Sequence, residues 1–143
     1  MSRQVDAHDR KVVSVRFCAT PGRRNIAGMP DECLFCKLVA GEVPATVVRE
    51  GERTLAFRDI APQAPTHVLI ISKTHHANVS ALAAADAGLL VEIHREATAV
   101  AAAEGITDTG YRLVYNTGRD GQQSVDHVHL HLIGGRPMSW PPG

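Results

Sequence analysis

Short runs of alternating apolar and polar residues divide the chain into five predicted strands. Residues 46–50 and 54–60 are typical of a hairpin with its turn at Gly51–Glu52. The apolar segment 66–72 follows "APQAP", whose prolines exclude a helix and favour a buried strand entered by a stiff loop. Two further strands are predicted at 111–116 and 124–133, joined by the loop "TGRDGQQ".

Helical spacing marks two other segments. Residues 33–41 predict a short helix that ends at Gly41. A longer helix is predicted to start at Ser80 and to end at Gly105, because apolar residues recur between them at helical spacing. These residues are Leu82, Ala85, Leu89, Ile93, Ala97 and Val100. Five strands with one long and one short helix define an α+β fold with a mostly antiparallel sheet.

The size and charge of the chain limit the classes of function. A length of 143 residues fits one domain with its own core. Residues 1–30 include "TPGRRNIAGMP" and are expected to form a flexible extension, so the domain is placed at 31–143. The 15 basic and 15 acidic side chains balance, which argues against binding to a nucleic acid polymer. Charged residues interrupt the alanine-rich stretch 81–103, so a membrane span is not expected.

The three cysteines are Cys18, Cys33 and Cys36. An odd number with one close pair is typical of a reducing compartment and suggests a metal or redox role for the pair. The first residues of the chain also lack the long apolar core of a secretory signal. We therefore expect a cytoplasmic protein.

The segment "SVDHVHLHLIGG" places His127, His129 and His131 at alternate positions, with aliphatic residues between them. Along a strand, such alternation turns the aliphatic side chains to one face and the histidines to the other. A single histidine of this kind is most often an ordinary half-buried side chain, but three in strict alternation favour a functional site.

Imidazole suits the transfer of a phosphoryl or nucleotidyl group. It is nucleophilic while neutral near pH 7, and it leaves readily once it is attached to phosphorus. The preceding loop "NTGRDGQQS" offers glycines, amides and a hydroxyl group, which can bring neutral donors close to phosphate oxygens. The motif and the loop together predict a site for phosphoryl or nucleotidyl transfer.

Other segments around this motif carry a family likeness. With "LAFRDIAPQAPTHVLIISKTH" before it and "GGRPMSWPPG" after it, "NTGRDGQQSVDHVHLH" closely resembles the histidine triad (HIT) family, in its branch of histidine triad nucleotide-binding proteins. The resemblance runs from about residue 31 to residue 143. The Trp-Pro-Pro-Gly ending separates this branch from the dinucleoside polyphosphate hydrolases.

The resemblance implies a HIT-like fold and a homodimer whose two sheets join into one ten-stranded sheet. It also implies a hydrolase that binds a purine nucleoside monophosphate and cleaves P–N bonds of nucleoside phosphoramidates, such as adenosine 5′-phosphoramidate, through a nucleotidyl-histidine intermediate. The implied nucleophile is His129, flanked by His127 and His131.

By the same matching, His67 orients the triad, Asp59 accepts from the ribose hydroxyls and Ser124 lies near the leaving group. The implied nucleotide-binding residues are Phe35, Leu38, Phe57, Asp59, Ile60, Asn116, Gln123, Ser124, His129, His131 and Trp140. For the four apolar residues 35, 38, 57 and 60 the sequence alone favours a place in the core, and Asp59 is also typical of a turn. The chain departs from many branch members at Gln122, where they have glycine, and at Asp126, where they have an aromatic residue.

The spacing of Cys33 and Cys36 lets both thiolates meet one metal ion. The candidates that complete a tetrahedral zinc site are His75 and His127, with His76 as the rival for the third place. Alternatively, the two cysteines are small buried residues of the short helix. A zinc ion with four protein ligands would be structural, and the hydrolysis would need no metal.

Three classes of function stay open at this point. The first is a phosphoramidase. The second is another enzyme with a nucleotidyl-histidine intermediate, either a dinucleoside polyphosphate hydrolase or a nucleotidyl transferase, and Trp140 argues against it. The third is a nucleotide-binding or protein-interaction module with vestigial catalysis.

Overall fold

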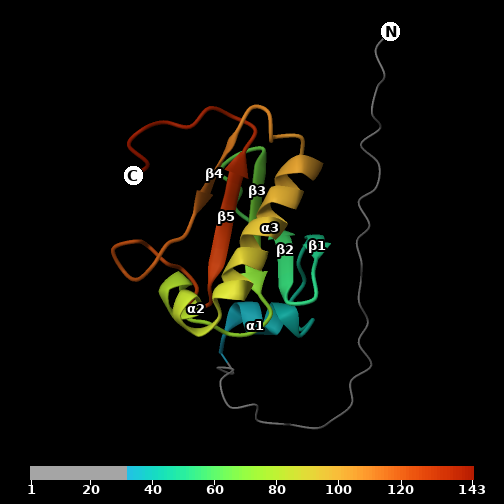
Figure 1. Ribbon diagram of the computed structural model, residues 1–143, viewed down its shortest axis with the longest axis vertical. Coiled ribbons are helices and arrows are strands. Elements are labelled where there is room, and N and C mark those ends of the chain that lie inside the picture. The colour runs from blue at the N-terminus through green and yellow to red at the C-terminus, as the bar shows by residue number, and fades with distance from the viewer. Residues whose placement is uncertain (1–31) are drawn as a thin grey trace.

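The computed structural model describes residues 32–143, so the extension expected at 1–30 lies outside the described residues. This part of the chain forms three helices and five strands (Figure 1). In order they are α1 (Leu34–Val39), β1 (Val47–Glu50), β2 (Thr54–Arg58), β3 (Thr66–Ser72), α2 (Val79–Ala85), α3 (Ala87–Ala103), β4 (Tyr111–Val114) and β5 (His129–Gly134). The predicted α+β class and antiparallel sheet are confirmed.

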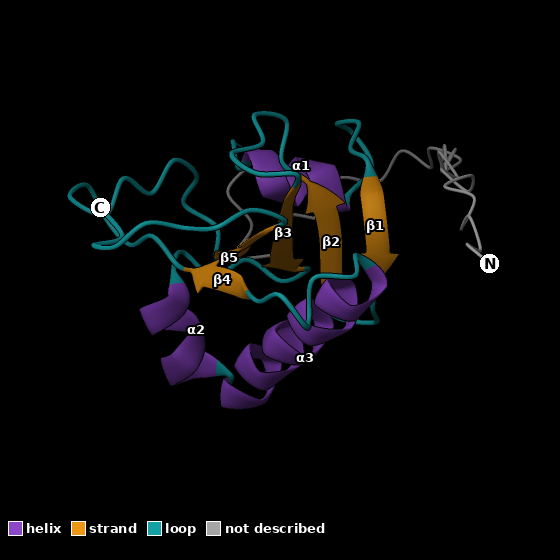
Figure 2. Ribbon diagram, turned by 90° about the horizontal axis from the view of Figure 1, so that it is seen from above, coloured by secondary structure: helices purple, strands orange, loops and turns teal. Residues whose placement is uncertain are grey.

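The five strands form one sheet in the order β1-β2-β3-β5-β4, and all neighbours are antiparallel. Strand β3 is buried along its whole length, as its continuous apolar sequence predicts for a central strand. In Figure 2, α1 lies over one face of the sheet, whereas α3 crosses the other face. The sheet therefore separates a layer that contains α3 from a layer that contains α1.

The two faces of β5 carry different chemistry. Val128 and the alternate β5 residues Leu130 and Leu132 are completely buried in the core under α3, with Ile93 and Val100 among their neighbours. The histidines of β5 face the smaller cluster on the α1 side, where Phe35 lies edge-on to His129. The face assignment predicted from the alternating motif is confirmed, because a period of two allows one strand to serve both layers.

The predicted long helix is wrong in one respect, since it is two helices. Asp86 has φ −154° and ψ 83°, which interrupts the helical backbone, and its side chain accepts from the N–H of Leu89 at 3.0 Å to cap α3. The first of the two helices is capped by Asn78 rather than by Ser80. Apolar spacing continues through the break, so periodicity alone did not reveal it.

The last strand is shorter than predicted. Strand β5 begins at His129, so His127 belongs to the loop before it, although it is buried like its neighbours. This placement frees the backbone of residue 127 from the strand ladder and lets its side chain turn toward α1.

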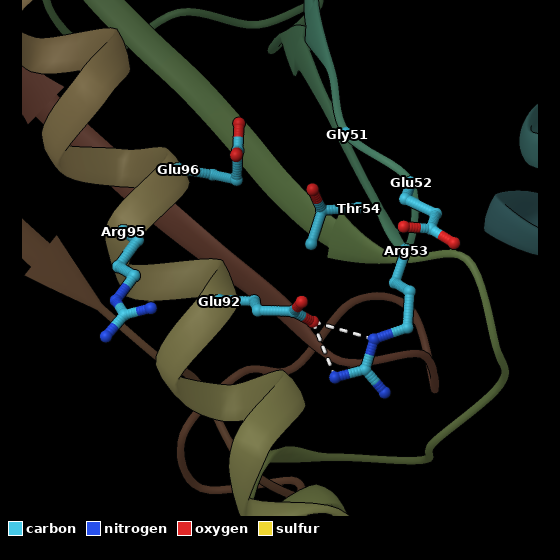
Figure 3. A pocket seen from close by; sticks show the side chains of 7 residues that line it. All are labelled: Gly51, Glu52, Arg53, Thr54, Glu92, Arg95 and Glu96. Carbon is cyan, nitrogen blue, oxygen red and sulfur yellow. Dashed lines mark hydrogen bonds and ion pairs between the residues drawn. The ribbon is translucent and has the colours of Figure 1, made fainter.

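A hollow beside α3 is lined by residues of the β1–β2 turn and of the helix (Figure 3). Arg53 donates there to Glu92 at 2.7 Å and to Asp86 at 2.8 Å, so cation and carboxylates neutralise one another and tie the hairpin to the helix. The hollow lies on the α3 side of the sheet, opposite the face that carries His129 and His131. Within residues 32–143, no helix is both long and apolar enough to cross a membrane.

Candidate active site

Four histidines gather on the α1 face of the sheet from β3, β5 and the loop before β5. His129 pairs in register with Ile71, and His131 with Leu69, while His67 of β3 faces Ile133. The rings of His129 and His131 have centroids 5.0 Å apart, and those of His67 and His131 are 5.2 Å apart. The antiparallel register thus places His67 diagonally beside the triad.

His129 has its ring fixed by the backbone. Its Nδ1–H donates to the carbonyl oxygen of His127 at 2.7 Å, so the lone pair of the neutral ring lies on Nε2. Burial lowers the pKa of His129, and the bond to the carbonyl partly opposes that shift. The site consequently holds a neutral imidazole whose Nε2 can attack an electrophile.

His67 and His131 form a chain of hydrogen bonds whose direction can be deduced. The backbone N–H of Gln63 donates to His67 Nδ1 at 3.0 Å, so this nitrogen carries no proton. His67 Nε2–H then donates to His131 Nδ1 at 2.9 Å, which leaves the proton of a neutral His131 on Nε2. Among the described residues, buried His131 Nε2 has no hydrogen-bond partner. This N–H is available to an oxygen of a bound substrate.

Asp59 lies beside His67 in this chain of bonds and has the turn role that the sequence allowed. One carboxylate oxygen accepts from the N–H of Ala61 at 2.8 Å, as in a turn, and the other lies 3.4 Å from His67 Nε2. Asp59, His67 and His131 place ligand-type atoms within 4.8 Å of one another. We do not regard them as a metal site, because His67 Nδ1 accepts from Gln63 and its Nε2 must carry the proton.

The four apolar residues of the implied base pocket divide into two groups. Phe35 and Phe57 are buried, with ring centroids 5.5 Å apart, and Leu38 packs against their cluster. Ile60 is fully exposed, so the core interpretation is wrong for this residue. An exposed isoleucine next to Asp59 leaves room for a ligand to cover it.

The loop residues are less closely joined to the triad. Asn116 is half-buried and Ser124 is exposed, both in the segment that leads from β4 to β5. The amide of Gln123 bonds to backbone groups of Ala77, Gly118 and Val125 instead of facing the histidines. Trp140 is 81% exposed near the C-terminus, so among the described residues of one copy it does not enclose the site.

A second cluster joins α1 to the triad. The ligand-type atoms of Cys33, Cys36, His75 and His127 all lie within 4.8 Å of one another. His127 Nδ1 is 3.5 Å from each sulfur, and His75 Nδ1 is 3.3 Å from Cys36 Sγ. The rival candidate, His76, instead has its Nε2 3.2 Å from the hydroxyl of Thr74.

The donors of this cluster fit a zinc ion. His127 Nε2–H donates to the carbonyl of Ser72 at 2.7 Å, which aims the unprotonated Nδ1 at the two sulfurs. Burial lowers the pKa of His127 to about 4 and raises the pKa of Cys36 to about 12, the latter helped by its bond to Cys33. The imidazole is therefore neutral, as a ligand must be, and a cation would supply the charge that converts the thiols to thiolates.

The backbone groups that set the positions of the histidine protons could not be predicted from the sequence. They are the carbonyls of His127 and Ser72 and the N–H of Gln63. Every residue has such groups, so no residue type signals them. Only the position of "APQAP" just before His67 hinted at a turn able to direct an amide toward that ring.

Known proteins share this fold and its alternating histidines. The model of the HIT domain matches residues 40–138. The chain is 50% identical over 116 residues to a 14 kDa zinc-binding protein of Zea mays, covering 77% of this chain and 87% of that one. It is 43% identical over 110 residues to the purine nucleoside phosphoramidase of Escherichia coli K12, covering 77% and 92%.

A solved HIT family hydrolase from Legionella pneumophila superposes with a TM-score of 0.75 at 56% identity, covering 78% of this chain and 99% of that one. The chain belongs to the HIT family, and its solved neighbours support a hydrolase.

The first prediction concerns the charge of His131. Burial, and next the neighbouring His129, lower the pKa of His131 to about 4, so the folded protein keeps this ring neutral down to acid pH. The unfolded chain takes up the proton below about pH 6.5. The free energy of unfolding should therefore fall as the pH drops from 7 to 5, by about 1–2 kcal/mol from this residue.

Urea denaturation at pH 7 and pH 5 measures this loss of stability in the natural chain and in His131→Asn. The loss should be smaller in the variant, which lacks the titrating ring. An equal loss of stability in both proteins would contradict the buried neutral ring.

Proposed function

We propose that this protein is a purine nucleoside phosphoramidase, which hydrolyses the P–N bond of adenosine 5′-phosphoramidate and related compounds. The observation that carries the proposal is that His129 Nε2 has a free lone pair and that, within residues 32–143, the Nε2–H of neighbouring His131 has no partner. His129 Nε2 bonds to phosphorus as the P–N bond breaks, and the amine leaves with a proton taken from solvent, to which the attacking water of the next step returns one. Water then attacks phosphorus and releases the nucleoside monophosphate and the imidazole.

The other residues are assigned to binding and to positioning. His131 Nε2–H, together with Asn116, stabilises the charge on the α-phosphate oxygens. Asp59 accepts from the ribose hydroxyls, and Ser124 lies near the leaving group. The base is surrounded by four apolar residues, Phe35, Leu38, Phe57 and Ile60. The full exposure of Ile60 supports its part in this pocket, because a ligand can reach it. His67 holds the His131 ring through its 2.9 Å bond.

Two other functions use the same residues. A dinucleoside polyphosphate hydrolase or a nucleotidyl transferase would share the nucleotidyl-histidine but would release a phosphorylated leaving group, such as a nucleoside diphosphate, in place of an amine. An interaction module would bind nucleotides without turnover. The relative named as a purine nucleoside phosphoramidase favours cleavage of the P–N bond over both.

We also propose that the protein is a homodimer, joined through β4 into one ten-stranded sheet. Strand β4 is an edge of the sheet, and its Leu113 is partly exposed. The guanidinium of Arg112 donates to the carbonyl of Ser139 at 2.9 Å, which holds the C-terminal segment beside the same edge. A partner across β4 would meet exposed Trp140, which could then contribute to the partner's site.

For the cluster of Cys33, Cys36, His75 and His127 we propose a structural zinc ion. The donor set supports this, and so does the relative named as a zinc-binding protein. With four protein ligands the ion would have no open position for water, so the hydrolysis needs no metal. Its role would be to fix α1 against the sheet. Two reduced thiols also favour the cytoplasm as the compartment.

The second prediction tests the nucleophile. His129→Ala should lose turnover of adenosine 5′-phosphoramidate while its affinity for AMP stays within about tenfold, because the ring contributes chemistry and the pocket contributes affinity. His94→Ala, which changes a histidine of α3, is the control and should keep both. Single-turnover assays with the phosphoramidate and with diadenosine triphosphate also separate the three functions. Full activity of His129→Ala would contradict the assignment of His129 as the nucleophile.

The third prediction concerns the C-terminal segment. Deletion of residues 139–143 should reduce discrimination among phosphoramidates with different amines more than it reduces AMP binding, because Trp140 would act on the leaving-group side of the partner's site. Relative kcat/KM values across a series of amines measure this, and sedimentation of the full chain measures the dimer. Unchanged relative rates, or a monomer with full activity, would refute the shared site.

The fourth prediction concerns metal content. Protein purified without added zinc or a polyhistidine tag should contain about one zinc ion per chain. The double variant Cys33→Ser, Cys36→Ser should contain none and should melt at a lower temperature, whereas Cys18→Ser keeps the ion. Elemental analysis and thermal melts measure both effects. A zinc content well below one per chain in the natural protein would reject the site, and loss of activity on chelation without unfolding would reject a structural role.

A further inference from the structure

Gln123 uses its side-chain amide entirely on the backbone of three segments. Its Nε2 donates to the carbonyl of Ala77 at 2.7 Å and to the carbonyl of Val125 at 2.9 Å. Its Oε1 accepts from the N–H of Gly118 at 3.2 Å. Both N–H groups of the amide are thus engaged, and the oxygen already has a donor. Little bonding capacity is left for a ligand.

We propose that Gln123 is a positioning residue, a clasp that fixes the loop between β4 and β5, and that it is not a ligand of the nucleotide. Its effect on catalysis rests on the proposed function, whereas the clasp itself rests only on these bonds. The assignment replaces the nucleotide-binding role that the family resemblance implies for this residue.

The clasp closes the loop on itself. Gly118 N–H donates to the Gln123 side chain, and the N–H of Gln123 donates to the carbonyl of Gly118 at 3.1 Å. Both backbone polar groups of Gly118 are therefore engaged by one residue. Gly118 has φ +71°, a left-handed conformation that glycine adopts without strain, and the two bonds hold that turn in place.

The clasp also fixes the backbone on both sides of Ser124. The bond from the Gln123 side chain to the carbonyl of Val125 spans Ser124, which limits the rotation of its backbone. The same carbonyl accepts from the N–H of His127 at 2.8 Å. A single carbonyl thus links Gln123 to the first residue of the triad, and Ser124 is held in a defined direction relative to it.

The third bond anchors the loop to the body of the domain. Ala77 follows the two histidines after β3, and its neighbour His76 accepts from the N–H of Val128 at 2.7 Å. The segments 76–77 and 123–128 are therefore tied at two points, one through the Gln123 side chain and one through backbone. Loss of the side chain leaves the backbone tie, so the domain should stay folded while the loop loosens.

The adjacent Gln122 provides a matched control. It is the same residue type in the same loop, its side chain is exposed, and within residues 32–143 that side chain makes no hydrogen bond. Gln122→Ala keeps a non-glycine residue at its φ of +56°, so the backbone strain is unchanged. The two variants then differ only in whether the clasp is removed.

The first measurement is amide hydrogen exchange followed by NMR. In Gln123→Ala the N–H of Gly118 should exchange about tenfold faster or more, while the N–H of Leu130 in β5, the internal reference, keeps its rate. Gln122→Ala should leave both rates unchanged. Unchanged exchange of Gly118 in Gln123→Ala would overturn the clasp, whatever the protein catalyses.

The second measurement separates positioning from ligand binding. In Gln123→Ala the kcat for adenosine 5′-phosphoramidate should fall about tenfold or more, while the Kd for AMP stays within about threefold. Gln123→Glu keeps the shape but turns a carboxylate toward two carbonyls, so it should be at least as impaired. Weaker AMP binding with unchanged kcat would overturn the proposal and indicate that Gln123 is a ligand of the nucleotide. Full activity of Gln123→Glu would also overturn it, because the hydrogen bonds of the amide would then not matter for catalysis.

The two measurements distinguish failure of this proposal from failure of the proposed function. If the natural protein binds AMP but does not cleave the phosphoramidate, the proposed function is wrong. Gly118 exchange and the Kd for AMP in Gln123→Ala still decide between a clasp and a ligand.

Discussion

The site depends on one hydrogen bond, from His129 Nδ1–H to the carbonyl oxygen of His127. An imidazole can attack only through a nitrogen that carries a lone pair, and this bond decides which nitrogen that is. The donor is in the first residue of β5, and the acceptor lies just before the strand begins. Because the strand ladder starts at His129, the carbonyl of residue 127 is free to face back toward the ring. The start of β5 is therefore a feature of the chemistry as well as of the fold.

The same residue connects the triad to the cysteines. His127 gives its carbonyl to His129, donates from Nε2 to Ser72 and aims Nδ1 at Cys33 and Cys36. Its Nε2 is bonded to β3, its Nδ1 faces the cysteines at α1, and its carbonyl is bonded to the triad. All three elements therefore determine the position of residue 127. A metal ion in the cysteine cluster would hold this residue still without touching a substrate. The structural role proposed for zinc and the orientation of the proposed nucleophile thus meet in one residue, through its side chain and its backbone carbonyl.

Much of this arrangement could be predicted from the sequence because it depends on side-chain periodicity. Alternation in "HVHLHL" placed Leu130 under α3 and His129 on the opposite face, and the continuous apolar run of β3 gave the central strand. The break at Asp86 could not be predicted, because an aspartate fits both a helix surface and an N-cap, and the apolar spacing continues past it.

The choice of His75 over the adjacent His76 depends on how the chain turns after Ser72, which residue types do not encode. The proton positions depend on backbone groups, which leave no trace in the sequence. The clasp of Gln123 was also hidden, since an amide in a glycine-rich loop is equally suited to a phosphate and to a carbonyl.

The most direct test of this account is the tautomer of each ring, read from ¹⁵N NMR shifts of the histidines in the free protein near pH 7. Directed by their partners, His129 should carry its proton on Nδ1, whereas His127, His131 and His67 should carry theirs on Nε2. A proton on Nε2 of His129 would leave that nitrogen without the lone pair needed for attack. That result would contradict the assignment of His129 as the nucleophile.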